Sequence, residues 1–222
     1  MIPWTPNLDW NAPAGKLLDE LAAVLPANTL HAITVFGSAP LQLALDSAFL
    51  SADVDVISPE DLSELIRAHS LGKDQRPLYL EQCQPSAFVT ASDWSARSFQ
   101  ARRQSVNYCF PHPLDLLVSK LQRLEQKDLE AFRLVCGRRL FSEDDFRTVL
   151  MNAVDIYRPR FAEEQFAADI FENTRAVWQE IYGKAIDVRL EIVVPALAKR
   201  KLSHGAAAQK WKAQLSHVAG FF

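Results

Sequence analysis

Two short segments, "VFGSAP" (residues 35–40) and "SADVDV" (51–56), carry the strongest structural signal in the sequence. The first leads from an apolar, β-branched stretch into a Gly-Ser pair, in a chain with only seven glycines. The second places Asp53 and Asp55 one residue apart in another β-branched stretch. Because successive side chains of a strand point to opposite faces, both carboxylates are expected on one face.

The Gly-Ser pair is predicted to lie between a strand and a helix. The segment "LHAITVF" (30–36) is short, apolar and β-branched, which is typical of a buried strand. Ser38 is a suitable N-cap and Pro40 suits a first helical turn, so "APLQLALDSAF" (39–49) is expected to be a helix. The predicted order is therefore strand, turn, helix, and then the Asp-x-Asp strand at 52–58.

The rest of the sequence changes from mixed to helical near "PHP" (111–113). Ser58, Pro59 and Asp61 form a helix-start signal for the segment 58–70. Before residue 111 we also expect a helix at 14–26, strands at 77–83 and 105–110, and a strand or loop at 88–94. Afterwards we expect helices at 113–126, 127–137, 142–154 and 161–183 and a basic pair at the end, with Gly137 and Gly183 as C-caps.

Composition excludes several classes of protein. With 49% hydrophobic and 23% charged residues the chain is globular rather than disordered. Its longest apolar runs are far shorter than the roughly 20 residues that span a bilayer, and its opening lacks a signal-peptide pattern. We therefore expect a cytoplasmic protein with no membrane partner. An odd number of widely separated cysteines argues against disulfides and against a Cys-x-x-Cys zinc site: Cys83, Cys109 and Cys136.

Charge is unevenly distributed along the chain. Residues 183–222 contain seven Lys and Arg against two Asp and Glu, so a net charge of −3 overall leaves −8 on residues 1–182. A basic end of this kind fits nucleic acid or an acidic partner, and it equally fits a solvated helix face.

The pair of segments has the composition of a metal-dependent phosphate site. Two neighbouring carboxylates repel each other unless a cation lies between them or water screens them, and Mg²⁺ binds one or two carboxylates together with substrate phosphates. Gly37 would let a triphosphate approach the backbone, while Ser38 and the start of the following helix would donate hydrogen bonds to it. Taken singly, Asp53 and Asp55 also fit a solvated edge strand, and the Gly-Ser pair an ordinary turn.

These motifs resemble the signature of the DNA polymerase β-type nucleotidyltransferase superfamily, a Gly-Ser turn followed by an Asp-x-Asp strand. The segment "PHPLDLLVSKLQRLEQKDLEAFRLV" is similar to bacterial toxin-like nucleotidyltransferases of the type IV abortive-infection group, and the resemblance covers roughly residues 30–135. It implies an α+β fold, a small mixed sheet flanked by helices, as a domain of residues 1–135. The helical pattern of the remaining sequence predicts a C-terminal helical bundle at 136–222.

The resemblance also implies roles for two residues of the helical segment. Lys120 and Asp128 match a lysine and an aspartate that form further motifs of the toxin-like group. From the residues alone, Lys120 fits either a phosphate contact or a solvated lysine beside an apolar stripe. Asp128 fits a helix cap, an ion pair with Lys120 or Arg123, or a catalytic acid.

The superfamily pattern includes a third carboxylate on a neighbouring strand. Glu81 is the candidate for this position, and Asp93 is placed less well. Glu81 also fits an ordinary surface acid, because toxin-like members often lack the third group. The spacing of fourteen residues between Ser38 and Asp53 is slightly long for the superfamily.

Other polar clusters give weaker signals. Arg97, Arg102 and Arg103 are predicted to lie in a basic loop that contacts a nucleotide or RNA or is merely solvated. His112, between two prolines, is expected to be a turn residue rather than a general base.

The resemblance implies an enzyme that moves a nucleoside monophosphate from an NTP to a hydroxyl of tRNA or protein, with Mg²⁺ or Mn²⁺ as cofactor. In a toxin–antitoxin pair, an antitoxin would be the partner. Two alternatives stay open: a nucleotide- or RNA-binding module of the same fold without turnover, and a helical interaction protein that uses residues 139–222.

Overall fold

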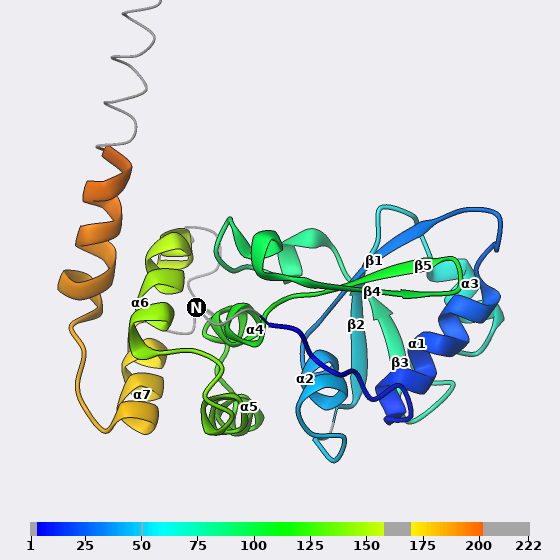
Figure 1. Ribbon diagram of the computed structural model, residues 1–222, viewed down its shortest axis with the longest axis horizontal. Coiled ribbons are helices and arrows are strands. Elements are labelled where there is room, and N and C mark those ends of the chain that lie inside the picture. The colour runs from blue at the N-terminus through cyan, green and yellow to red at the C-terminus, as the bar shows by residue number, and fades with distance from the viewer. Residues whose placement is uncertain (1–3, 50, 158–169, 202–222) are drawn as a thin grey trace, which may run out of the picture.

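The computed structural model describes residues 4–49, 51–157 and 170–201. It contains a five-stranded sheet with helices beside it, followed along the chain by a group of further helices (Figure 1). The sheet contains both parallel and antiparallel pairs. The expected α+β class, with a small mixed sheet and a C-terminal helical region, is therefore confirmed.

The strand order is β3-β2-β1-β5-β4, with β1 at the centre. The strands are β1 (His31–Phe36), β2 (Asp53–Ile57), β3 (Tyr79–Gln82), β4 (Phe99–Arg103) and β5 (Val106–Phe110). β1 pairs antiparallel with β2 and parallel with β5, β2 pairs parallel with β3, and β4 pairs antiparallel with β5. Asp55 is the register partner of both Phe36 and Glu81. The end of β1 and the acid of β3 therefore lie on either side of Asp55.

The helices fall into two groups. Those of the first half are α1 (Pro13–Val24), α2 (Ala39–Ala44) and α3 (Ser63–Ala68), with the 3₁₀ turns η1 (Pro85–Ala87) and η2 (Trp94–Arg97). Those of the second half are α4 (Pro113–Lys120), α5 (Gln126–Gly137), α6 (Glu143–Asn152), η3 (Val154–Tyr157) and α7 (Ile170–Tyr182). A π-helical turn, η4 (Arg189–Val193), belongs to a final helical stretch at 188–201.

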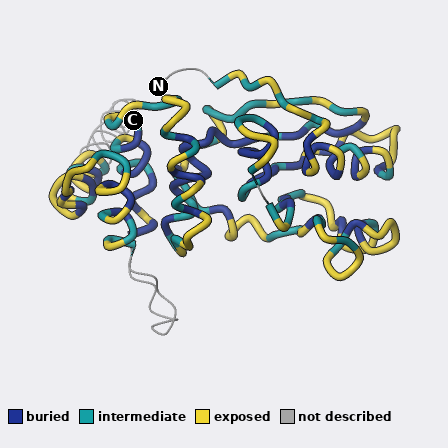
Figure 2. Tube along the Cα trace, turned by 90° about the horizontal axis from the view of Figure 1, so that it is seen from below, coloured by how far each residue is buried: buried dark blue, intermediate teal, exposed yellow. Residues whose placement is uncertain are grey.

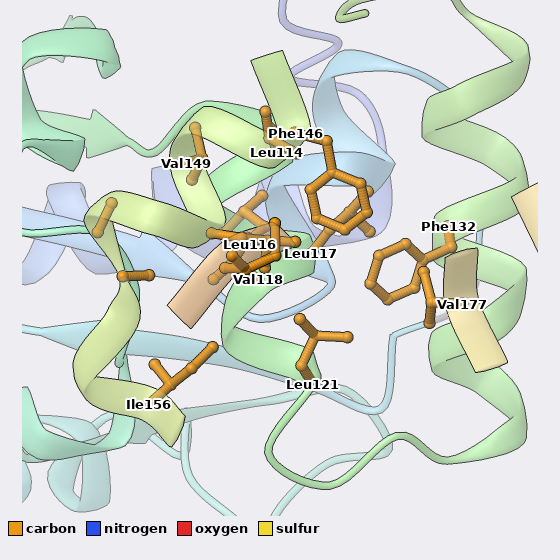
Figure 3. Packing of buried hydrophobic residues seen from close by; sticks show 14 of the residues in the cluster. Leu114, Leu116, Leu117, Val118, Leu121, Phe132, Phe146, Val149, Ile156 and Val177 are labelled. Carbon is orange, nitrogen blue, oxygen red and sulfur yellow. The ribbon is translucent and has the colours of Figure 1, made fainter. Parts of the chain in front are cut away.

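The buried apolar side chains form two clusters. The first packs α1, α2 and α3 on the sheet, where the Tyr108 hydroxyl donates a 2.6 Å hydrogen bond to the Leu18 carbonyl. In the second, the apolar side of α4 is surrounded by α5, α6 and α7 (Figure 3). Figure 2 shows the resulting distribution, with buried residues along the inward sides of the elements and exposed residues on the outer loops.

The first two helices after β1 are shorter than expected. α2 ends at Ala44 rather than continuing to residue 49, and α3 begins at Ser63 rather than near Ser58. The Gln82 side chain explains the late start of α3, because it accepts a hydrogen bond from the Leu62 N–H and donates one to the Glu60 carbonyl. These bonds hold the segment against β3, so its backbone groups are not available to an earlier helical turn.

Three further expectations need correction. The basic segment expected as a loop forms strand β4. The helix expected at 113–126 ends at Lys120, after which Leu124 has a φ of 47°. Gly137 lies inside α5, and it is Arg139 that adopts a positive φ beyond the helix. Gly183 does follow α7 with a φ of 65°, as predicted.

Several predictions concern the chain as a whole. Within the described residues no helix combines the length and the apolar character that crossing a membrane requires. The three cysteines are free, half-buried thiols. The division at residue 135 stays a prediction, and the expected basic helices after residue 183 fall partly outside the described residues.

Candidate functional site

A cleft of about 430 Å³ opens where the sheet meets the connection between α4 and α5. One wall carries the acids of β2 and β3, the turn after β1 lies between the walls, and the other wall is the α4–α5 connection. The predicted residues that line it are Gly37, Ser38, Asp53, Asp55, Glu81, Lys120 and Asp128. Segments far apart in the sequence thus contribute to one cleft.

Three carboxylates come together on the acidic wall. Asp53, Asp55 and Glu81 each present an oxygen, and these oxygens lie within 4.8 Å of one another. Strand β2 alternates as predicted, because Val54 and Val56 are fully buried while both aspartates lie on the opposite, half-exposed face. Glu81 lies beside them because β3 runs parallel to β2, in a register that places Glu81 opposite Asp55.

Gly37 occupies a position that strongly favours glycine. Its φ is +71°, a conformation that costs other residues energy. A Cβ built on Gly37 would lie 2.2 Å from Asp55 Oδ2, well inside any real contact distance. The glycine therefore makes room for the carboxylate of Asp55 as well as for the turn.

The acids of this wall interact unfavourably with one another. Burial, followed by the charges of Asp53 and Glu81, raises the pKa of Asp55 to about 6, against lowering contributions from Cys83 and Lys120. Cys83 Sγ lies 3.7 Å from Asp55 Oδ1, and its own pKa is raised to about 12 by burial and by these acids. A hard divalent cation would relieve this repulsion, and three carboxylates are suitable oxygen ligands for Mg²⁺.

The opposite wall holds a buried ion pair. Lys120 Nζ donates to Asp128 Oδ1 at 2.7 Å and to Ser38 Oγ at 3.2 Å. The Lys120 side chain is 9% exposed and that of Asp128 is 1% exposed. Ser38 occupies the N-cap position of α2, but its hydroxyl makes no capping bond and instead accepts from Lys120. Lys120 therefore links the Gly-Ser turn to α5.

Asp128 also has a local structural role. Its Oδ2 accepts a 2.9 Å hydrogen bond from the Glu125 N–H, which forms half of a capping box at the start of α5. The chain turns between α4 and α5, and this turn brings Asp128 back toward Lys120. Two of the alternatives left open by the sequence, a cap and a partner of Lys120, are thus both present.

Several weaker candidates lie outside the cleft. Arg97 forms a bidentate pair with the fully buried Asp115, and Asp93 pairs with Arg97 rather than joining the acidic wall. Arg103 pairs with Asp19 and lies over Trp10, while Arg102 donates to a neighbouring backbone carbonyl. His112 caps α4, since its Nδ1 accepts from the Leu114 N–H, and burial lowers its pKa to about 4.

The cleft also contains residues that the sequence motifs did not single out. Its second wall includes Gln122, Arg123 and Lys127, and its rim includes Ser86 and Ala87. Arg123 and Lys127 follow Lys120 by three and seven positions, a spacing that would have placed all three on one side of a continuous helix.

Comparison with known proteins gives one match. A family model described as "Nucleotidyltransferase of unknown function (DUF6036)" matches residues 15–155, which include the whole sheet and both walls of the cleft. No curated protein and no solved structure matches the chain. Because the match covers more than half of the chain, the protein belongs to this family of nucleotidyltransferases of unknown function.

Proposed function

We propose that the protein transfers a nucleoside monophosphate from an NTP to an acceptor hydroxyl and releases pyrophosphate, in a reaction that depends on Mg²⁺. The observation that carries this proposal is the composition of one cleft, in which three carboxylates face a buried lysine across a Gly-Ser turn. Membership of a nucleotidyltransferase family supports the class of reaction.

The acidic wall is assigned to the metal. Asp53 and Asp55 would hold Mg²⁺, or Mn²⁺, which prefers the same oxygen ligands. An ion bound there would supply a positive charge that offsets the negative charge developing on the substrate phosphates. Gly37 keeps this part of the cleft open, because any side chain in its place would collide with Asp55.

The lysine wall is assigned to the triphosphate. Lys120 offers a point charge to a phosphate oxygen. Ser38 offers its hydroxyl, which already accepts a hydrogen bond from Lys120. Asp128 is a positioning residue, because it holds Lys120 in place through a 2.7 Å ion pair while capping α5. The loss of Asp128 would therefore disturb both the lysine and the helix start.

The proton of the acceptor is assigned to Glu81. The acceptor oxygen forms a bond to the α-phosphorus, the bond from that phosphorus to the bridging oxygen breaks, and pyrophosphate leaves with the bond electrons. Glu81 is exposed and lies on the edge strand β3, whereas Asp55 packs against Gly37. An acceptor hydroxyl approaching from solvent thus meets Glu81, which takes its proton.

The finer assignments follow the resemblance of the motifs. We place the chain with the DNA polymerase β-type superfamily and its toxin-like group, with residues 1–135 as the transferase part and 136–222 as a helical region. The acceptor is then a hydroxyl of RNA, such as tRNA, or of protein. Within a toxin–antitoxin pair, an antitoxin is the regulatory partner.

The test is transfer of label by the purified full-length chain. Each of the four α-³²P-labelled NTPs is incubated with Mg²⁺, bacterial RNA and protein lysate. Asp53→Asn/Asp55→Asn is compared with Asp74→Asn/Asp144→Asn, a control that removes the same charge from two exposed positions outside the cleft. The proposal predicts that label reaches RNA or protein with the wild type and the control and is absent with the cleft variant.

Two outcomes would contradict the proposal. Transfer that survives Asp53→Asn/Asp55→Asn would remove these residues from the reaction. Mg²⁺-dependent NTP binding without transfer by the wild type would instead support the alternative of a binding module. The position of Glu81 within the acidic cluster favours the enzyme, because it supplies the third carboxylate that such a module would not need.

A further inference from the structure

A pair of cations on the second wall of the cleft has no part in the assignments above. Arg123 and Lys127 both line the cleft, and each forms an ion pair with Glu125. Arg123 Nε lies 3.0 Å from Glu125 Oε1, and Lys127 Nζ lies 3.4 Å from Glu125 Oε2. One carboxylate thus bridges two cations, and this carboxylate does not itself line the cleft.

The charge of the cleft shows why these cations matter for a nucleotide. Four carboxylates line it, those of Asp53, Asp55, Glu81 and Asp128. Lys120 already forms a buried ion pair with Asp128. Arg123 and Lys127 share the single carboxylate of Glu125, so together they add a net positive charge to the wall opposite the acids, next to that of Lys120.

We infer, on the basis of the proposed function, that Arg123 and Lys127 bind the β- and γ-phosphates of the incoming nucleotide. Glu125 holds these two cations until the nucleotide displaces the Glu125 carboxylate. Two cations that converge on one carboxylate form a site suited to an anion with several oxygens, as a phosphate is. All three side chains are exposed, and ion pairs between exposed side chains contribute little. Exchanging Glu125 for a triphosphate therefore costs little.

The inference predicts opposite effects for the two kinds of residue. Arg123→Ala/Lys127→Ala removes two phosphate contacts and is expected to weaken triphosphate binding at least tenfold while leaving nucleoside monophosphate binding within twofold. Glu125→Gln removes the competing charge and is expected to tighten triphosphate binding about threefold. Its amide keeps the length of the side chain at the start of α5, so helix formation is preserved.

Isothermal titration calorimetry of the full-length chain tests this inference. The probes are inorganic tripolyphosphate with Mg²⁺, the four NTPs, the four nucleoside monophosphates and bacterial tRNA. The matched control is Arg133→Ala/Lys184→Ala, which likewise removes an Arg and a Lys from exposed ion pairs, outside the cleft. It is expected to bind tripolyphosphate as the wild type does.

The possible results separate this inference from the proposed function. If Asp53→Asn/Asp55→Asn abolishes tripolyphosphate binding while Arg123→Ala/Lys127→Ala leaves it within twofold of the wild type, the proposed function stands and the inference fails. A loss of tRNA binding alone would assign the pair to an acceptor backbone and would also overturn the inference. If the wild type binds neither NTPs nor tripolyphosphate, the proposed function itself fails.

Discussion

Replacing Gly37 with alanine is expected to separate the geometry of the cleft from the stability of the fold. The new Cβ would lie 2.2 Å from Asp55 Oδ2, and ordinary contact begins at 3.4 Å, so the carboxylate has to move by about 1.2 Å. A displacement of about 1 Å in a reacting constellation can reduce the rate by roughly 100-fold. The positive φ of 71° adds a stability cost of roughly 1–2 kcal/mol for any residue with a Cβ.

Gly183→Ala is the matched control for this substitution. Gly183 has a φ of +65° and nothing within 4 Å of its Cβ position, so alanine there brings the same backbone cost without a collision. Urea unfolding should show losses of roughly 1–2 kcal/mol in both variants, with a further loss in Gly37→Ala from the collision. Label transfer should fall by roughly 100-fold in Gly37→Ala alone. Equal activity in the two variants would refute the assignment of Asp55 to the reaction.

Four further predictions concern charged groups. The pKa of Asp55 is raised from 3.8 to about 6, so the stability contributed by its protonated carboxyl is present below pH 3.8 and is lost as the pH rises to about 6. Asp55→Asn should therefore be more stable than the wild type at pH 8 without metal, by up to about 3 kcal/mol in urea unfolding. Mg²⁺ should raise the Tm of the wild type at pH 8 but not that of Asp55→Asn, and an equal rise in both would exclude Asp55 as a ligand. Lys120→Met should lower the free energy of unfolding by about 3 kcal/mol, because it leaves Asp128 buried without its partner. Adding Asp128→Asn should restore part of this loss, and strictly additive losses would contradict a coupled pair. Arg97→Met should cost about 3 kcal/mol by stranding the buried Asp115, with unchanged transfer per folded molecule, and a fall in NTP affinity without loss of stability would reverse that assignment.

Much of the fold follows from local sequence signals. The apolar and β-branched run at 30–36 predicts β1, and the alternation of acid and valine in "DVDV" predicts which face of β2 is buried. The late start of α3 could not be predicted, because the Gln82 side chain that prevents an earlier helical turn comes from a strand twenty residues further on. β4 could not be predicted for a related reason, since its ladder with β5 and the pairing of Arg103 with Asp19 decide its conformation.

The site could be predicted residue by residue but not as an arrangement. The motifs identified Gly37, Ser38, Asp53 and Asp55, whose spacing is local. Whether Glu81 is a third carboxylate or a surface acid depends on the parallel pairing of β3 with β2, which no local signal specifies. In the same way, the burial of Lys120 depends on the turn that returns Asp128 toward it.

The most direct test of the account compares two labels on the same nucleotide. The full-length protein is incubated with Mg²⁺ and acceptor extract, and with one NTP labelled either at the α- or at the γ-phosphate. The account predicts that the α-label becomes attached to the acceptor and that the γ-label is released as pyrophosphate in equal amount, with both products lost in Asp53→Asn/Asp55→Asn. Attachment of the γ-label to the acceptor would show phosphoryl rather than nucleotidyl transfer and would contradict the account.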